Sequence, residues 1–89
     1  MERFRISSKD YYFLKTSFDT LEYYVVSLFY YGDYCVMEML DNRVRDFWMD
    51  YRSVMARKGY TNGKLNDTGV RLRDLWNDCF QEKIHLPID

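Results

Sequence analysis

Few side chains in this sequence have the chemistry of a catalytic residue, and they are widely separated. His85 is the only histidine, and it lies close to Pro87 in a segment expected to be a tail, where a rigid site is hard to build. Cys79 and His85 have the side-chain types of a nucleophile and a base, but no glycine-rich loop that could form an oxyanion hole accompanies them. We therefore expect no nucleophilic catalysis.

Carboxylates and thiols also lack the spacing of a metal or acid–base site. Asp41, Asp46 and Asp50 are interleaved with arginines, which is typical of a solvated charged face. Cys35 and Cys79 have no Cys-x-x-Cys spacing and no cluster of histidines around them, so both are expected to be reduced thiols. The sequence predicts no catalytic residue, no metal site and no cofactor, and hence a protein that is not an enzyme.

Length and composition indicate one compact domain, residues 1–89, with 1–7 and 85–89 extended or frayed. Of the 89 residues, 47 % are hydrophobic and 30 % charged, and the net charge is −1, which is far from disordered compositions. The first residues contain no apolar signal segment. The longest uncharged run, Tyr23–Gly32, is about half the roughly 20 residues that a membrane-spanning helix requires. We expect an intracellular, cytoplasmic protein that does not enter the membrane.

Two segments have the periodicity of amphipathic helices. Apolar residues recur every three or four positions over 34–58, with Asp33 as the expected N-cap. The same periodicity recurs over 68–83, where Asn66 or Asp67 can cap the helix. Both segments are therefore predicted to be helices with one buried face.

The segment between these helices contains the strongest turn signal in the chain, the pair Asn62-Gly63. Gly59 fits the left-handed position that commonly follows a helix. Pairing of the residues on either side of the turn into a small hairpin is left open, because an isolated two-residue ladder is marginal in water.

The first third of the chain is ambiguous between helix and strand. Helical spacings of 4, 3, 4 and 3 separate Leu14, Phe18, Leu21, Val25 and Leu28. As a strand, Tyr23–Tyr31 is rich in β-branched and aromatic residues, and Gly32-Asp33 could turn a hairpin. We prefer the helix, because residues 37–40 would have to form the returning strand and are better helix formers. Ser7-x-x-Asp10 is a candidate helix start.

These assignments predict an all-α fold, a small bundle of three to four helices. The alternative is an α+β fold with an N-terminal β-hairpin or meander packed on two C-terminal helices. In either fold the apolar run Tyr23–Tyr31 exceeds what so short a chain can cover, since each element is buried on one side only. A surplus of this kind indicates an interface.

The aromatic residues of this region are predicted to contact a partner, because Tyr and Phe bring large contact area at low entropic cost. The predicted contact residues are Tyr23, Tyr24, Phe29, Tyr30, Tyr31 and Tyr34. We expect a small non-catalytic protein-binding module, a regulatory inhibitor or adaptor of the kind that phages and plasmids also encode, with a homodimer as one form. The sequence does not identify the partner.

The alternative function is a nucleic-acid-binding regulator that uses a basic helix end and turn around residues 52–64. The residues that would contact phosphates and a base are Arg52, Arg57, Lys58, Tyr60 and Lys64. Basic residues at a helix C-terminus also stabilise the helix dipole without any ligand. We rank this function below protein binding.

Overall fold

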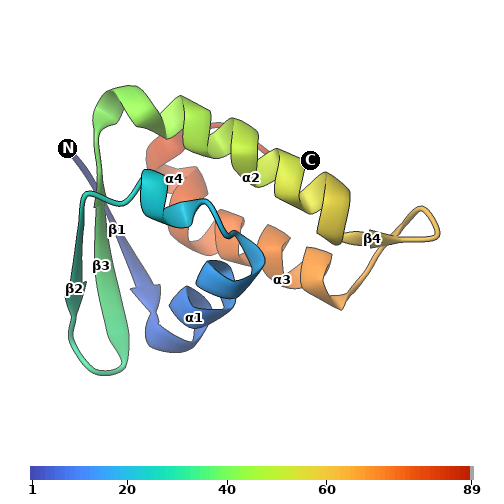
Figure 1. Cartoon of the computed structure of the whole chain (residues 1–89), viewed down its shortest axis with the longest axis horizontal. Helices are drawn as coiled ribbons and strands as arrows, with labels where there is room; N and C mark the ends of the chain where they lie inside the picture. The colour runs from blue at the N-terminus through green and yellow to red at the C-terminus, as the bar shows by residue number, and fades with distance from the viewer. Residues whose placement is uncertain (89) are drawn as a thin grey trace.

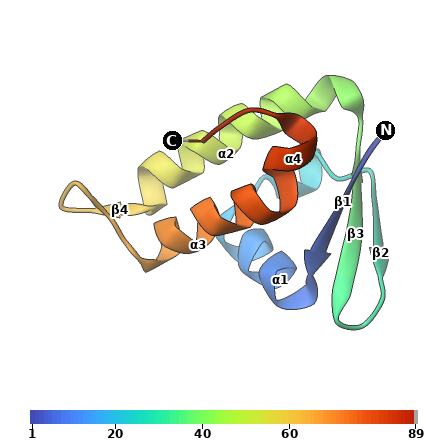
Figure 2. The ribbon, with the colours of Figure 1, turned by 180° about the vertical axis from the view of Figure 1, so that it is seen from behind.

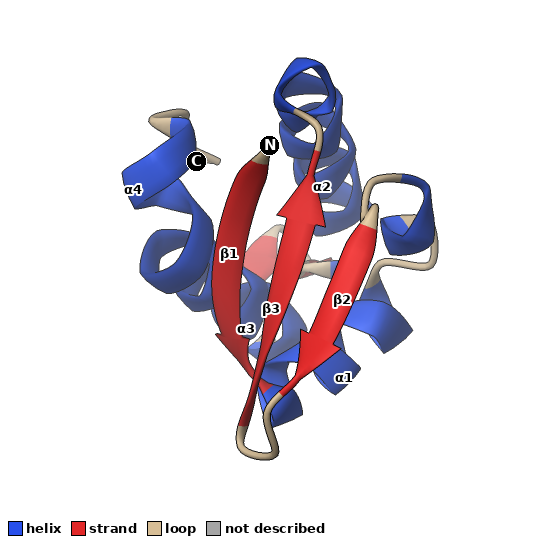
Figure 3. Ribbon diagram, turned by 90° about the vertical axis from the view of Figure 1, so that its left-hand side faces the viewer, coloured by secondary structure: helices blue, strands red, loops and turns tan. Residues whose placement is uncertain are grey.

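The computed structural model describes residues 1–88 and has an α+β fold (Figure 1). A three-stranded antiparallel sheet forms one layer, and the helices lie behind one of its faces (Figure 3). The elements labelled η1 and η2 are 3-10 helices, and the element labelled η3 is a π-helix. The elements in chain order are β1 Glu2–Ser7, α1 Ser8–Ser17, η1 Leu21–Tyr23, β2 Ser27–Tyr30, β3 Tyr34–Met39, η2 Asp41–Arg43, α2 Val44–Lys58, β4 Tyr60–Thr61, β5 Lys64–Leu65, α3 Asp67–Leu75, η3 Trp76–Phe80 and α4 Gln81–Ile84. The prediction of an all-α helical bundle is therefore wrong, and the α+β alternative fits.

The central strand of the sheet is β3, which pairs antiparallel with both β1 and β2. Residues 31–33 connect β2 to β3, with Gly32 and Asp33 at the centre of the turn, and the amide of Tyr31 donates to the carbonyl of Tyr34 at 2.9 Å. Gly32 has a φ of 79°, and glycine at the first central position is typical of a type II′ hairpin turn. The hairpin of the α+β alternative is thus formed.

Alternation along the strands gives the sheet two faces of different character. The face toward the helices is apolar, and its buried residues are Phe4, Ile6, Cys35, Met37 and Met39. The residues between them point away from the helices, because successive side chains of a strand lie on opposite faces. The inner face therefore supplies one wall of the core.

The predicted helix over 34–58 is wrong over residues 34–43, and Asp33 is not its N-cap. These residues form β3 and a 3-10 turn, and α2 begins at Val44. Met, Glu and Leu favour a helix, but such preferences are worth at most about 0.7 kcal/mol per residue. Pairing on both sides by β1 and β2, together with complete burial of Met37 and Met39, outweighs them.

The predicted helix through Leu28 is also wrong in its second half. The helix start at Ser7 is confirmed, since its hydroxyl accepts from the amide of Asp10 at 3.1 Å. After α1 the chain turns through η1 and enters β2, where the β-branched and aromatic run pairs with β3. The run that was ambiguous in the sequence is therefore an edge strand.

The two C-terminal helical segments agree closely with the sequence. The helix α2 ends at Lys58 as predicted, and the side chain of Asn66 caps α3 by accepting from the amide of Gly69 at 2.8 Å. The segments α3, η3 and α4 follow one another without a break and lie beside α2 (Figure 2). At Asn62-Gly63 both residues have positive φ, as a type I′ turn requires, and β4 and β5 pair as a hairpin.

Two glycines allow α2 and α3 to meet at this hairpin. The backbone of Gly59 has φ −90° and ψ −2°, so the predicted left-handed conformation is wrong. A Cβ at Gly59 would lie 2.7 Å from the carbonyl oxygen of Met55, and one at Gly69 would lie 2.1 Å from that of Gly59. Both positions are therefore restricted to glycine by close approach of backbone to backbone.

The core between the helices is built largely from aromatic rings around Phe47. Its ring lies 5.1–5.8 Å from those of Phe18, Tyr24, Tyr51, Trp76 and Phe80. Most of these pairs meet edge to face or tilted, the geometries that aromatic quadrupoles favour. The buried hydroxyl of Tyr51 donates to the carbonyl of Leu72 at 2.6 Å, so the core also satisfies its polar group.

The segment after α4 packs on the helices through two indole groups. Trp76 Nε1 donates to the carbonyl of Leu86 at 2.8 Å, and Trp48 Nε1 donates to that of Pro87 at 2.7 Å. Ile88 is buried. Residues 85–88 are thus held against the body of the domain, whereas residue 89, the end of the predicted tail, lies outside the described residues.

Candidate partner-binding surface

The face of the sheet that points away from the helices is uncovered. Figure 3 looks directly onto β1, β3 and β2, with all helices behind them. By register, nine residues of the strands and the hairpin point outward. Two are the serines Ser7 and Ser27, and we call the other seven the outer sheet face: Arg3, Arg5, Phe29, Tyr31, Tyr34, Val36 and Glu38. This surface lies on paired strands, so its side chains are held by a rigid support.

Aromatic rings dominate one half of the outer sheet face. The rings of Tyr31 and Tyr34 stack with centroids 5.1 Å apart and planes 20° from parallel. The guanidinium of Arg5 lies over the Tyr34 ring at 3.9 Å. Phe29, which is 44 % exposed, lies in the next row of the same face, opposite Val36. These residues form a continuous apolar surface with one cationic group on it.

The other half of the outer sheet face is polar but nearly neutral. Arg3 Nε donates to Glu38 Oε2 at 2.6 Å, and the two residues are directly opposite in the register of β1 and β3. The side chain of Glu38 is largely buried, whereas the side chain of Arg3 is exposed. Within residues 1–88 no carboxylate forms an ion pair with Arg5. The guanidinium of Arg5 is therefore the charge that this surface offers to a ligand.

The structure places the six predicted contact residues in four different environments. Phe29, Tyr31 and Tyr34 lie together on the outer sheet face. Tyr30 points to the other side of β2 and packs its ring against Tyr11 at 6.1 Å, while remaining 58 % exposed. Tyr23 projects from η1 and is 76 % exposed.

Tyr24 belongs to the core, where it is 6 % exposed and packs between Phe18 and Phe47. Its hydroxyl donates to the carboxylate of Asp50 on α2. Burial, reinforced by the hydrogen bond and the negative charge of Asp50, raises the pKa of Tyr24 from 10.0 to about 12. This ring stabilises the fold and presents no surface to a partner.

The raised pKa of Tyr24 predicts a loss of stability in alkaline solution. Above about pH 10 the hydroxyl ionises in the unfolded chain, while in the folded protein it stays protonated up to about pH 12. The unfolded state then binds fewer protons, so the free energy of unfolding falls as the pH rises through this window. Urea midpoints measured by circular dichroism at pH 9 and pH 11.5 should show this fall, and Tyr24→Phe should reduce it. An equal fall in both proteins would contradict the assignment.

The residues of the nucleic-acid alternative are dispersed over separate surfaces. Arg52 lies over the ring of Trp48 at 4.8 Å and, with Tyr60, lines a groove of about 400 Å³ that also contains Ile88. Lys58 Nζ instead donates to the carbonyl of Ser17, at the end of α1. Arg57 and Lys64 are exposed, on α2 and β5. The structure brings only Arg52 and Tyr60 into one groove.

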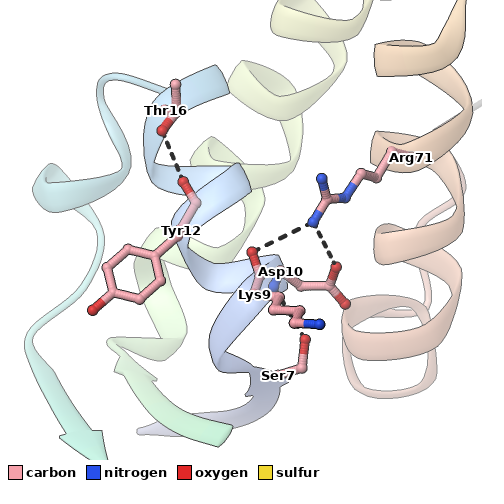
Figure 4. A network of polar contacts seen from close by, with 6 residues as sticks. All are labelled: Ser7, Lys9, Asp10, Tyr12, Thr16 and Arg71. Atoms are coloured by element: carbon pink, nitrogen blue, oxygen red, sulfur yellow. Dashed lines mark hydrogen bonds and ion pairs between the residues drawn. The ribbon is translucent and has the colours of Figure 1, made fainter. Parts of the chain in front are cut away.

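A second groove, of about 350 Å³, separates α1 from α3 and contains four carboxylates around one arginine. Arg71 Nη2 donates to the carbonyl of Lys9 and to Asp10 Oδ1, both at 3.4 Å, and so links the two helices (Figure 4). Arg71 also lies over the Phe13 ring at 4.1 Å. We regard this network as a structural contact between helices.

The two cysteine thiols are both withdrawn from solvent, one fully and one in part. Burial raises the pKa of the Cys79 thiol from 9.0 to about 11, so it is neutral near pH 7. Cys35 is buried behind the sheet. Residues 1–88 contain no group of three or more His, Cys, Asp or Glu side chains that could hold a metal ion. Within the same residues, every helix is too short or too polar to cross a bilayer.

Sequence reasoning missed the charged and aliphatic part of the outer sheet face, namely Arg3, Arg5, Val36 and Glu38. The alternation of Arg3 and Arg5 with Phe4 and Ile6 was the available signal, since it predicts one polar and one apolar face.

Comparisons of this chain with protein-family models, with curated proteins and with solved structures found no match.

Proposed function

We propose that this protein is a small binding module, a regulatory inhibitor or adaptor, which occupies a surface of a partner protein through its outer sheet face. The observation that supports this proposal is that exposed Phe29 and Tyr31 lie with the half-buried Tyr34 on one face of paired strands. Rings fixed in this way lose little conformational entropy on binding, and aromatic residues are enriched among those that dominate binding energy.

The charge of the surface favours a protein over a nucleic acid. The outer sheet face carries two arginines and one glutamate, and Arg3 is already paired with Glu38. Nucleic-acid affinity depends mainly on several Lys and Arg contacts to phosphates, which this face does not provide. A partner with an apolar patch and one acidic group opposite Arg5 would be complementary to it.

The test is affinity capture from host cells with Tyr31→Ser and Tyr34→Ser combined in one variant. We expect the captured partner to bind at least about tenfold more weakly, because losing two central rings typically costs more than 1 kcal/mol each. The matched control combines Met49→Ser and Tyr60→Ser, which are 53 % and 47 % exposed on another surface and should leave capture unchanged.

Both variants must remain folded by circular dichroism before capture is compared. Unchanged capture by the folded Tyr31→Ser, Tyr34→Ser variant would show that the outer sheet face is not the binding surface. Arg5→Glu provides a separate readout. Reversing the charge of this residue should weaken the binding of a partner that has an acidic group opposite it, and should leave the binding of a purely apolar partner unchanged.

A further inference from the structure

The two edges of the three-stranded sheet differ in how they are protected. The edge of β1 lies beside η3 and α4, where Lys83 donates to the carbonyl of Arg3 and Phe80 packs on Phe4 at 5.1 Å. The edge of β2 has no neighbouring strand (Figure 3). Within residues 1–88, β2 therefore ends the sheet with backbone groups that no strand satisfies.

The hairpin determines which backbone groups of β2 point outward. Hydrogen-bonded and non-hydrogen-bonded pairs alternate along antiparallel strands, and Tyr31 is bonded to Tyr34. Phe29 therefore directs its N–H and C=O groups to β3, whereas Leu28 and Tyr30 direct theirs away from the sheet. These two residues provide two donors and two acceptors on the open edge.

Two of the devices that normally prevent strand addition are absent from this edge. Proteins protect open edges with charged side chains, proline or bulges. The segment Tyr23–Gly32 contains neither a charged residue nor a proline. Its exposed residues are instead apolar or aromatic, namely Tyr23, Val26, Phe29, Tyr30 and Tyr31.

A groove of about 210 Å³ opens beside the same edge, on the side of the sheet that faces the helices. It is lined by Tyr11 of α1, Leu21 and Glu22 of η1, and residues 25–28. Its walls combine apolar side chains with polar groups, among them Ser27 and the carboxylate of Glu22.

We propose that this edge binds a second copy of the same chain, with the two β2 strands antiparallel about a twofold axis. In the register that places Phe29 opposite Phe29, Leu28 of each copy lies opposite Tyr30 of the other. The two outward residues of each strand then form four main-chain hydrogen bonds, and the two sheets join into one of six strands.

The groove and the aromatic residues support this register. Side chains that are opposite each other lie on the same face, so Tyr30 of the second copy lies beside Leu28, next to the groove. The two Phe29 rings meet on the outer face as a close cross-strand pair. The proposal goes beyond the proposed function: it shares Phe29 and Tyr31 with the outer sheet face, but its main-chain hydrogen bonds lie on the edge of the sheet, and its tests measure self-association alone.

The exposed area sets the expected strength of this dimer. The rings of Tyr23, Phe29, Tyr30 and Tyr31 at or beside the edge are between 44 % and 76 % exposed. At roughly 100 Å² per ring, they offer about 400 Å² per copy, half of what each partner contributes to a standard interface. We therefore expect a reversible dimer with a dissociation constant on the order of tens of micromolar.

The first test measures amide hydrogen exchange by NMR at about 10 μM and 1 mM, alongside sedimentation equilibrium. We expect the amides of Leu28 and Tyr30 to exchange roughly fivefold more slowly at the higher concentration, because mass action lowers the monomer fraction by about that factor when the dissociation constant is tens of micromolar. The amide of Phe29 is the internal control, since its bond to β3 protects it at both concentrations. A monomer at 1 mM, or a dimer in which Leu28 and Tyr30 exchange as fast as in the monomer, would overturn the proposal.

The second test introduces a charge at Phe29, the residue that lies on the twofold axis of the proposed dimer. Phe29→Lys should weaken self-association at least tenfold because two lysines would then be opposed, and Phe29→Glu should do the same. An equimolar mixture of the two variants should associate again, since each lysine then meets a glutamate. If both variants are folded by circular dichroism and the mixture remains monomeric, the register is wrong. Tyr60→Lys, on a distant hairpin, should dimerise like the unmodified protein.

Discussion

Replacing Phe47 by alanine should lower the free energy of unfolding by about 3–5 kcal/mol. Phe47 is fully buried, and its ring contacts five other aromatic rings: two from the segments on either side of η1, one from α2 and two from η3. These rings are fixed by one another, so the structure has little freedom to collapse into the cavity that the substitution leaves.

The measurement is urea unfolding at pH 7, followed by circular dichroism. Met49→Ala is the matched control on the same helix, because Met49 is 53 % exposed and its loss should change stability by no more than about 0.5 kcal/mol. Since small domains are stable by only about 5–15 kcal/mol, Phe47→Ala should bring the protein close to unfolding. A loss below about 1 kcal/mol would show that the aromatic cluster is not the main source of stability.

Replacing Gly69 by alanine should destabilise the protein by about 3 kcal/mol, although alanine is the better helix former. A Cβ at this position would lie 2.1 Å from the carbonyl oxygen of Gly59 and 2.7 Å from Leu65 Cδ1. Gly59 is backbone at the end of α2 and cannot move without separating the two helices. The steric clash therefore outweighs the gain of about 1 kcal/mol in helix propensity.

The control for this substitution is Gly63→Ala in the β4–β5 turn. No atom lies within 4 Å of a Cβ placed there, but its φ of 77° disfavours alanine, so a loss of about 1–2 kcal/mol is expected. The comparison separates steric clash from backbone strain. If Gly69→Ala is as stable as the unmodified protein in urea, the helices are not in contact through their backbones.

Local signals in the sequence were sufficient for the C-terminal half of the fold. The apolar periodicity predicted α2 from Val44 to its end and the helix after Asn66, and the pair Asn62-Gly63 predicted the turn between them. These features depend on residues within a few positions of one another, such as the Asn66 cap on Gly69. Short-range interactions of this kind can be read without knowing the tertiary structure.

The sheet could not be predicted with equal success, because its stabilising contacts connect distant parts of the chain. Residues 34–39 contain strong helix formers, and their strand conformation depends on pairing with residues 2–7 and 27–30. Cys35, Met37 and Met39 occupy alternate positions, which is the spacing of a strand, but the spacing of Val36 and Leu40 matched the helix that follows. Tertiary pairing decided between the two.

The surface was predicted in part. Phe29, Tyr31 and Tyr34 were predicted to contact a partner, and the structure brings them together on the outer sheet face. The sequence could not separate them from Tyr24, which belongs to the core, or from Tyr30, which lies on the opposite side of the strand. That separation requires the register of β2 against β3, because a shift of one residue exchanges the two faces.

The strand β1 is made first but packs against η3 and α4, which are made last, and this order affects folding during synthesis. Phe4 leaves the ribosome early, yet its packing partner Phe80 and the lysine that reaches Arg3 arrive only with the last third of the chain. At a synthesis rate of about 5–20 residues per second, this delay lasts roughly 4–15 seconds. During that time Phe4 and the edge of β1 lack these contacts and remain open to other nascent chains. The speed at which η3 and α4 emerge from the ribosome therefore controls how long the unfinished protein is at risk of aggregation.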